Sequence, residues 1–327
     1  MHIDIHSHVI PPRIVDAIAA DPKGFAARIE GHGASRRMVH DQGYAYPLFD
    51  EFVDPAAKLA VMDRKGLDMS IVSTAPPMFY YWAEAELAAK AARLVNDGIA
   101  EMVASAPQRL RGMASVPMQH PELAIAELER AVSTHGFKAV EIGTTIEGVQ
   151  LADPRFQPFL RRARDLDVLV FIHPYYVGSK AGLESYYLTN LAGNPADTAV
   201  SIANLIFSGA LDELAGLKIL AAHGGGYAPY QIGRLVHGHA VRDEARSLTA
   251  SSPKDLLKQL YFDTLLFDPQ ALRFLIDLVG PDHVCLGTDA PFDMGDETPL
   301  ASLAAVPGLT SREEAAIVAG TATALLG

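Results

Sequence analysis

Cysteine is almost absent from this sequence. Cys285 is the single cysteine among 327 residues, which excludes an internal disulfide and a cysteine-rich zinc module. Disulfides belong to oxidising compartments, so one isolated thiol is typical of a reducing compartment, and we expect the protein to be cytoplasmic. The first residues, MHIDIHSH, lack the basic and apolar regions of a signal peptide, which agrees with that location.

Long apolar runs and basic residues are also scarce. We find no uncharged apolar stretch of the roughly 18 residues that a membrane-spanning helix needs. The 27 Lys and Arg residues stand against 39 Asp and Glu residues, which gives a formal net charge of −12. A surplus of negative charge disfavours nucleic acid and anionic membranes as partners. We therefore expect a soluble protein that acts on a small molecule.

Short apolar runs bounded by turn residues occur eight times along the chain. Several, such as VLVFIH at 168–173, are almost wholly apolar, which is typical of strands that are covered on both faces of a parallel sheet. The predicted strands are His2–Ser7, Asp68–Thr74, Leu110–Val116, Ala139–Gly143, Val168–His173, Lys218–Ala222, Leu260–Thr264 and His283–Thr288.

Helical patterns separate most of these strands, at Ala83–Ser105, Pro121–Thr134, Pro154–Arg164, Ala196–Leu214 and Pro269–Leu278. Eight alternating units predict an α/β protein with a distorted (β/α)8 TIM barrel, in a single domain of residues 1–327. An open doubly wound sheet is the alternative fold. It lacks support because the first strand is not followed by a G-x-G-x-x-G turn and the chain has no Walker A pattern.

Two connections are too long for simple loops. One is an insertion after the first strand, at about residues 9–55, and the other runs from Pro174 to about Asn194. Both follow the carboxyl end of a strand, which is the active face of a barrel. We therefore expect these segments to cover a pocket there.

Five potential ligands or acid–base groups lie at predicted strand ends. His6 and His8 are two apart on the first strand, so their side chains project from the same face. His173, His223 and Asp289 end the fifth, sixth and eighth strands. The pattern predicts a metal site whose ligands are His6, His8, His173 and Asp289. His223 remains as the general acid or base, so we assign His223 and Asp289 to the catalytic group.

Nitrogen and carboxylate ligands without thiolate suit Zn2+ first, with Mn2+, Fe2+, Co2+ and Ni2+ as alternatives. Three nitrogens and one carboxylate leave a position for a water molecule, whose pKa a bound Zn2+ lowers to about 7. A hydroxide nucleophile is then available near neutral pH. We expect one metal ion, because the only lysine of the fourth strand region, Lys138, lies at the strand's beginning and not where it would bridge two ions.

These motifs resemble the amidohydrolase superfamily. The resemblance is carried by Ile3-Asp4-Ile5-His6-Ser7-His8, the histidines after strands five and six, and Gly287-Thr288-Asp289. Within the superfamily the chain is similar to the branch named for aminocarboxymuconate-semialdehyde decarboxylase, through strings that include Ala75-Pro76-Pro77-Met78-Phe79, His223-Gly224-Gly225-Gly226 and Asp289-Ala290-Pro291-Phe292.

The resemblance implies a (β/α)8 barrel with one divalent metal, commonly zinc, held at His6, His8, His173 and Asp289. It also implies that His223 serves the metal-bound water as acid or base. Arg234 matches an arginine that reaches a neighbouring subunit's site and holds a substrate carboxylate. The resemblance therefore implies a functional homodimer.

One position departs from that branch. The decarboxylase has a second carboxylate-binding arginine where this chain has Tyr46, and a phenol gives one neutral hydrogen bond in place of a bidentate cation. A substrate with fewer carboxylates, or an amide or ester, fits this site better. Phe79, Trp82 and Phe292 are candidates for contact with a planar substrate. For Phe79 and Trp82, packing beneath the insertion is the alternative role.

We expect a metal-dependent, non-oxidative decarboxylase of a small conjugated or aromatic carboxylic acid in catabolism, acting through a metal-bound water or hydroxide. A metal-dependent hydrolase of an amide, lactone or activated C–C bond is the alternative at the same site. A noncatalytic barrel that binds a metal or ligand is the third interpretation. The expected partners are a small-molecule carboxylic acid and a second copy of the chain, without nucleic acid or membrane.

Overall fold

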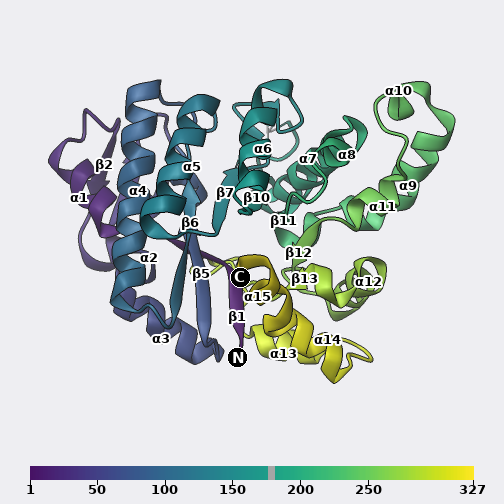
Figure 1. Cartoon of the computed structure of the whole chain (residues 1–327). Coiled ribbons are helices and arrows are strands. Elements are labelled where there is room, and N and C mark those ends of the chain that lie inside the picture. Colours follow the sequence, from purple (N-terminus) through teal and green to yellow (C-terminus); the bar gives the residue numbers. More distant parts are fainter. Residues whose placement is uncertain (176–180) are drawn as a thin grey trace.

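Eight parallel strands form the central sheet of the computed structural model, which describes residues 1–175 and 181–327. Figure 1 shows the sheet surrounded by helices, with the N mark at the lower end of β1 and the C mark above it, beside α15. The predicted segment from Pro174 to about Asn194 falls partly outside the described residues, at 176–180. The strands, in sheet order, are β1 (Ile3–Val9), β5 (Met69–Thr74), β6 (Leu110–Ser115), β7 (Ala139–Gly143), β10 (Leu169–His173), β11 (Ile219–Ala221), β12 (Tyr261–Asp263) and β13 (Val284–Cys285).

The sheet closes between β1 and the segment that follows β13. The backbone N–H of Ile5 donates to the carbonyl of Leu286 at 2.9 Å, and the N–H of His8 donates to the carbonyl of Ala290 at 2.7 Å. Ser7 and Ala290 form an isolated parallel bridge at the same seam. The predicted (β/α)8 barrel is confirmed. Its distortion lies in the short β13 and in a register shift between Asp4 and Ser7 on β1.

Helices connect the strands and cover the outside of the barrel (Figure 1). In α4, Ala88, Ala91, Val95 and Ile99 recur every three or four residues and are all buried, as expected for a helix with one apolar face. The helices between barrel strands are α3 (Pro55–Lys65), α4 (Ala85–Ser105), α5 (Pro121–His135), α6 (Gln157–Asp165), α7 (Asn194–Phe207), α8 (Ala210–Glu213), α9 (Ala228–Val241), α10 (Asp243–Arg246), α11 (Pro253–Leu257) and α12 (Pro269–Val279), followed after β13 by α13 (Pro299–Ala304), α14 (Ser311–Ala315) and α15 (Thr321–Leu326).

The apolar core has an inner and an outer layer. Inward-facing side chains such as Ile5, Phe171 and Leu220 fill the barrel, and Leu325 of α15 packs against them. The larger cluster lies between the barrel and its helices. A barrel filled in this way has no open channel, so chemistry is restricted to the ends of its strands.

The insertion after β1 contains secondary structure of its own. Helix α1 (Pro12–Ala20) is followed by an antiparallel sheet of β2 (Ala27–Glu30), β3 (Arg37–His40) and β4 (Ala45–Pro47), and then by α2 (Asp50–Val53). Tyr46, paired with Met38 across this sheet, reaches the Met78 sulfur in the segment after β5. The inserted sheet thus packs over the carboxyl end of a barrel strand. A second small hairpin, β8 (Thr145–Ile146) with β9 (Val149–Gln150), follows β7.

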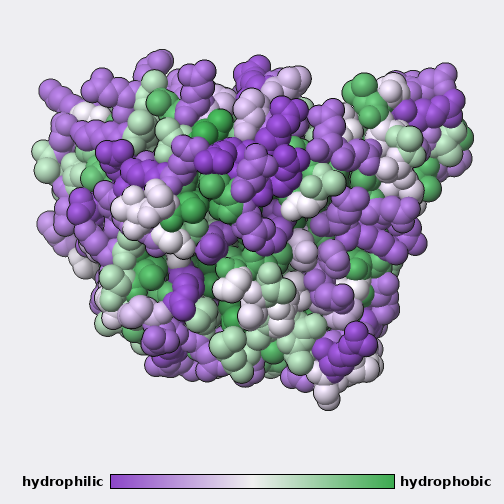
Figure 2. All heavy atoms as spheres, viewed as in Figure 1, coloured by the Kyte–Doolittle hydropathy of each residue, from purple (hydrophilic) through white to green (hydrophobic). Residues whose placement is uncertain are grey.

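The α9–α11 region projects from the rest of the molecule at the upper right of Figure 1, and the space-filling view in Figure 2 shows the same projection. Several large apolar side chains in and beside this region are exposed, including Tyr230, Leu248 and Phe274. Among the described residues, no helix combines the length and apolarity needed to cross a membrane.

Candidate metal centre

The structure brings His6, His8, His173 and Asp289 together at the carboxyl ends of the barrel strands. All four are buried, and one potential ligand atom from each lies within 4.8 Å of those of the others. The Nε2 atom of His8 lies 3.1 Å from Asp289 Oδ1 and 3.1 Å from His6 Nε2. This is the ligand set that the strand-end pattern predicted.

The other ring nitrogen of each histidine faces an acceptor. His6 Nδ1 lies 2.7 Å from the carboxylate of Asp263, His8 Nδ1 lies 3.3 Å from the carbonyl of Thr74, and His173 Nδ1 lies 2.8 Å from the carbonyl of Pro174. Such contacts favour the proton on Nδ1 and leave the Nε2 lone pair as a ligand. All three imidazoles are therefore oriented to donate electrons toward one point.

The charges around this point fit a cation. Burial lowers the pKa of His6, but the charges of Asp289 and Asp263 outweigh that effect and raise the pKa to about 10. Burial raises the pKa of Asp289, but its contacts with His6, His223 and His8 hold the pKa well below its ordinary value. His173 Nε2 and Asp289 Oδ1 are buried and have no hydrogen-bond partner among the described residues. A divalent ion would satisfy both atoms, so these side chains fit the implied metal.

His223 lies beside this cluster, two residues after the end of β11. Its Nε2 atom is 3.5 Å from Asp289 Oδ2, and its ring centre is 5.1 Å from that of His173. Its side chain is 18% exposed, whereas the His6 and His8 side chains are fully buried. His223 thus borders the ligand set and can still be reached from solvent, as an acid or base must be.

The predicted substrate contacts other than Arg234 divide into two groups. The Phe292 ring lies 5.2 Å from the His8 ring. Among the described residues, Tyr46, Phe79 and Trp82 have no ring contact with the four ligands; they belong to an aromatic wall built from the inserted sheet and the segments after β5 and β10. We define the aromatic wall as His40, Tyr44, Tyr46, Phe79, Tyr80, Tyr81, Trp82 and Tyr175.

Tyr46 is held tightly within the aromatic wall. Its hydroxyl contacts the sulfur atoms of Met38 at 2.8 Å and Met78 at 2.9 Å, and lies 3.0 Å from His40 Nε2. Burial raises the pKa of Tyr46 well above its ordinary value, so the phenol stays neutral. Tyr175 links the wall to the metal ligands, because it follows His173 by two residues and packs against Phe79.

Arg234 lies on α9 and is exposed. Among residues 1–175 and 181–327 it forms no ion pair, so its guanidinium is available to another molecule. An apolar cavity of about 340 Å³ lies between α9 and α12, where Tyr230 and Phe274 line it beside Gly224.

Three buried ionisable residues around the centre were not predicted from the sequence. Asp263, at the end of β12, contacts His6, and Glu141 on β7 lies 3.9 Å from His8 Nδ1. Burial raises the pKa of Glu141 to about 8. Lys58 of α3 donates to the carbonyls of His8 and Ala290 at 3.0 and 3.1 Å. For Asp263 a signal was present, because it lies one residue before the end of the predicted strand Leu260–Thr264.

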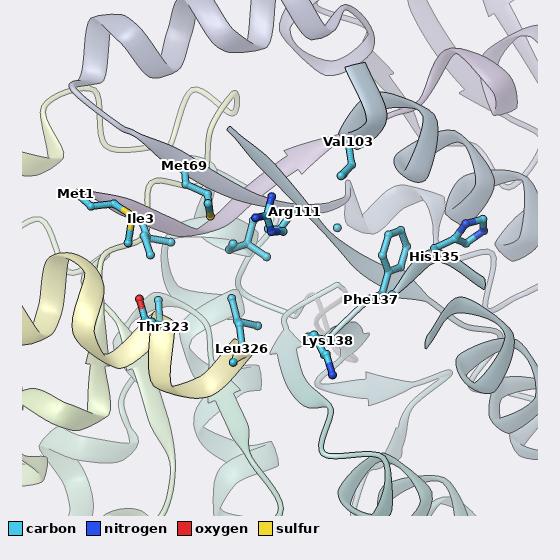
Figure 3. Close-up of a pocket in the computed structure, with 15 residues that line it drawn as sticks. Met1, Ile3, Met69, Val103, Arg111, His135, Phe137, Lys138, Thr323 and Leu326 are labelled. Atoms are coloured by element: carbon cyan, nitrogen blue, oxygen red, sulfur yellow. The ribbon is translucent and has the colours of Figure 1, made fainter. Parts of the chain in front are cut away.

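Another cavity, of about 280 Å³, lies at the opposite end of the barrel. Figure 3 shows side chains that surround it, among them Ile3, Met69, Arg111 and Lys138, which lie at or beside the amino ends of β1, β5, β6 and β7. The four ligands lie at or beyond carboxyl ends of strands, so this cavity is separate from the metal centre.

The family model described as amidohydrolase matches residues 3–327. The chain belongs to the amidohydrolase family. Within the family it lies in the branch of 2-amino-3-carboxymuconate-6-semialdehyde decarboxylase, because it is 32% identical to that protein of Dictyostelium discoideum over 329 residues, covering 100% of this chain and 92% of the relative.

Two further comparisons concern decarboxylases. This amidohydrolase is 31% identical to the gamma-resorcylate decarboxylase of Polaromonas sp. strain JS666 over 249 residues, which cover 72% of this chain and 76% of the relative. The fold is shared with the dihydroxybenzoic acid decarboxylase structure from Polaromonas sp. JS666, determined with bound manganese and the inhibitor 2-nitroresorcinol. That match has a TM-score of 0.80 and 24% identity, and it covers 99% of this chain and 96% of the other.

Proposed function

We propose that this amidohydrolase is a metal-dependent, non-oxidative decarboxylase of a small conjugated or aromatic carboxylic acid. The observation that carries the proposal is the convergence of His6, His8, His173 and Asp289 on one point, with His223 beside them. Its relatives of at least 30% identity include decarboxylases of 2-amino-3-carboxymuconate-6-semialdehyde and gamma-resorcylate. The geometry of the site and the similarity to these relatives therefore both favour decarboxylation.

Decarboxylation breaks a C–C bond, releases CO2 and leaves the substrate carbon with one new hydrogen. A proton must be delivered to that carbon, and His223 is the imidazole that borders the site with a partly exposed ring. Asp289 lies against the His223 ring and against the other ligands, so it fixes the distance between the acid and the metal position. We propose His223 as the acid–base catalyst and Asp289 as its neighbouring ligand.

A divalent ion held by these four side chains supplies Lewis-acid chemistry at the substrate. Zn2+ suits three imidazoles and one carboxylate, and it is our first proposal for the ion. Manganese is bound in the dihydroxybenzoic acid decarboxylase structure that shares this fold, so both Mn2+ and Zn2+ should be tested when the metal is restored. We propose one ion per chain.

The aromatic wall supports a flat substrate with few carboxylates. Tyr46, which replaces the branch's second carboxylate-binding arginine, offers a neutral hydroxyl that already contacts Met38, Met78 and His40. A second carboxylate placed there would be desolvated without a cation. We propose that Phe292 contacts the substrate beside His8, and that Tyr46, Phe79 and Trp82 shape the far side of the pocket.

We also propose a functional homodimer in which Arg234 binds a substrate carboxylate in the neighbouring subunit. Arg234 is exposed, and the aromatic side chains of Tyr230 and Phe274 are exposed close to its helix. Exposed apolar surface of this kind is typical of protein interfaces. We propose that residues 1–327 act as one domain, and that the protein works in the cytoplasm, where an unpaired thiol such as Cys285 stays reduced.

The proposed reaction is tested on purified protein whose metal content has been measured and restored with Zn2+ or Mn2+. This protein is incubated without oxygen, in heavy water, with a panel of aromatic and unsaturated carboxylic acids, amides and lactones. We expect CO2 release and a product that carries one deuterium at the carbon that lost the carboxylate. Metal-loaded His223→Ala protein is the matched control for uncatalysed decay.

The same panel distinguishes the hydrolase. Hydrolysis products from an amide, a lactone or an activated C–C bond, without CO2, would replace the decarboxylase proposal by a metal-dependent hydrolase at the same site. Failure to bind a metal after reconstitution would overturn both reactions.

A further inference from the structure

We propose that Asp263 is a positioning residue that fixes the metal ligand His6 and the backbone of His223 relative to one another. Asp263 is fully buried at the end of β12, between β11 and β13 of the barrel sheet. The part of the inference that concerns His223 catalysis rests on the proposed function. The part that concerns metal binding does not.

Four N–H groups surround the Asp263 carboxylate, two at each oxygen. Oδ2 accepts from His6 Nδ1 at 2.7 Å and from the backbone N–H of His223 at 2.9 Å. Oδ1 accepts from the backbone N–H groups of Gly224 at 2.8 Å and Leu265 at 3.1 Å. One oxygen thus joins a metal ligand to the residue proposed as acid and base.

The bonds to His223 and Gly224 depend on an unusual turn. His223 has φ +54° and Gly224 has φ +58°, so both are left-handed, and successive N–H groups in such turns converge on an anion. The left-handed conformation carries a conformational cost for a residue with a side chain, such as His223. The carboxylate of Asp263 offsets this cost, because it holds the two N–H groups where the turn directs them.

The charge state of Asp263 agrees with this role. All four groups that face its two oxygens are N–H donors, which is the surrounding that an ionised carboxylate requires. An ionised carboxylate accepts four hydrogen bonds and donates none. It therefore keeps the proton of His6 on Nδ1 and leaves Nε2 free for a metal.

Space for this contact is provided by Gly287. A Cβ atom at position 287 would lie 2.9 Å from Asp263 Cβ and 3.0 Å from His6 Cβ. Gly287→Ala therefore pushes the two side chains apart without changing any charge, and it gives an independent way to weaken their contact.

The chain also offers a matched control in Asp4, a second fully buried carboxyl group. Asp4 Oδ1 accepts from the backbone N–H groups of His6 and Thr288, and Oδ2 accepts from the hydroxyls of Ser70 and Thr288. Hydroxyls can turn to accept from an amide, so Asp4→Asn can keep all of these contacts. In Asp263→Asn one carboxylate oxygen becomes an NH2 group, which cannot accept from the N–H donors that face it. When this group takes the place of Oδ2, His6 Nδ1 can bond to it only as an acceptor, and the proton of the ring must then move to Nε2.

The experiment compares wild-type protein, Asp263→Asn and Asp4→Asn. The dissociation constant for Mn2+ or Zn2+ is measured by competition with a chelator, and the thermal midpoint reports folding. Hydrogen exchange of the peptide that contains His223 and Gly224 reports the turn. We expect Asp263→Asn to bind the metal 10- to 100-fold more weakly and to exchange these amide protons faster. Asp4→Asn should keep both properties near wild type.

A metal dissociation constant for Asp263→Asn within about threefold of wild type, or unchanged exchange at His223 and Gly224, overturns the proposal. An equal loss of metal affinity in Asp4→Asn also overturns it, because the effect would then be general damage to the barrel. Should Asp263→Asn not fold, Gly287→Ala takes its place with the same expected loss of metal affinity.

With a substrate found, activity gives a second and separate test. At saturating metal, Asp263→Asn should lower kcat in the wild-type background and have little further effect in His223→Ala, because residues that act together are not additive. Additive losses would overturn the link to His223. The metal measurement stands apart from this test, so a failed decarboxylase assignment and a failed role for Asp263 remain distinguishable.

Discussion

The Nε2 atoms of His6 and His8 lie 3.1 Å apart at the carboxyl end of β1, where both side chains are fully buried. With each Nδ1 facing an acceptor, the two Nε2 lone pairs point at one another. Such a contact is favourable only when a proton or a cation lies between the nitrogens. Burial lowers the pKa of His6, but the carboxylates of Asp289 and Asp263 raise it to about 10. A proton can therefore occupy this place when no ion is bound, and a divalent ion can occupy it without the proton.

Removing the metal should therefore destabilise the fold. A ligand present at about 100 times its dissociation constant adds about 2.7 kcal/mol to the free energy of unfolding. We expect chelation to lower the thermal midpoint by several degrees and re-addition of Zn2+ or Mn2+ to restore it. The control is His173→Ala, which lacks one ligand and should show a much smaller shift. Equal shifts in both proteins would contradict the assigned ligand set.

His223→Ala should separate metal binding from chemistry. His223 borders the cluster but is outside the four ligands, so the variant should keep the metal content of wild type. Turnover should fall by at least about 100-fold, because a positioned acid or base contributes that much or more. Metal analysis and single-turnover product assays check both parts. Near-normal turnover with metal bound would show that another group moves the proton.

Arg234→Ala should weaken substrate binding without affecting the metal site. Loss of a charged hydrogen bond of about 1.5 to 3 kcal/mol predicts a KM for a carboxylate substrate roughly 10- to 100-fold higher.

Mixed dimers of Arg234→Ala and His223→Ala chains test whether Arg234 of one subunit acts in the site of the other. Each mixed dimer would contain one intact site, so random exchange restores roughly a quarter of wild-type activity. No recovery in exchanged dimers would place Arg234 outside the neighbouring site.

His40 should make the fold sensitive to mild acid. Burial lowers the pKa of His40 to about 4 from 6.5, so in this interval the unfolded chain binds a proton that the folded chain excludes. The stability contributed by neutral His40 is present above pH 6.5 and is lost as pH falls toward 4. We expect His40→Gln to lose about 2 kcal/mol less stability than wild type between pH 7 and pH 4.5. Denaturant unfolding at the two pH values measures the difference, and parallel losses would contradict the prediction.

The sequence predicted the barrel well because each strand and covering helix carries its own hydrophobic pattern. The run at Leu169–His173 is readable without its neighbours, and the histidines at strand ends stand out because few other residues share their chemistry. The antiparallel sheet in the insertion was missed, since its short strands such as Ala45–Pro47 owe their order to packing against distant segments. Short strands carry too little pattern for local prediction.

The buried charged residues that surround the ligands were harder to predict from the sequence. Lys58 lies in a helix whose sequence resembles a solvated one, and only the fold shows that its amine is buried against two backbone carbonyls. Asp263 was visible as a carboxylate at a strand end, but its partners depend on the left-handed turn at His223. A backbone angle of that kind cannot be derived from residue spacing.

The seam of the barrel also determines when during synthesis the centre can form. Ser7 and Ala290 meet there although 283 positions separate them in the chain. During synthesis His6 and His8 therefore leave the ribosome long before Asp289 does. The complete set of four ligands therefore exists only after the segment that follows β13 has been made, so the earliest folding steps of a nascent chain proceed without it.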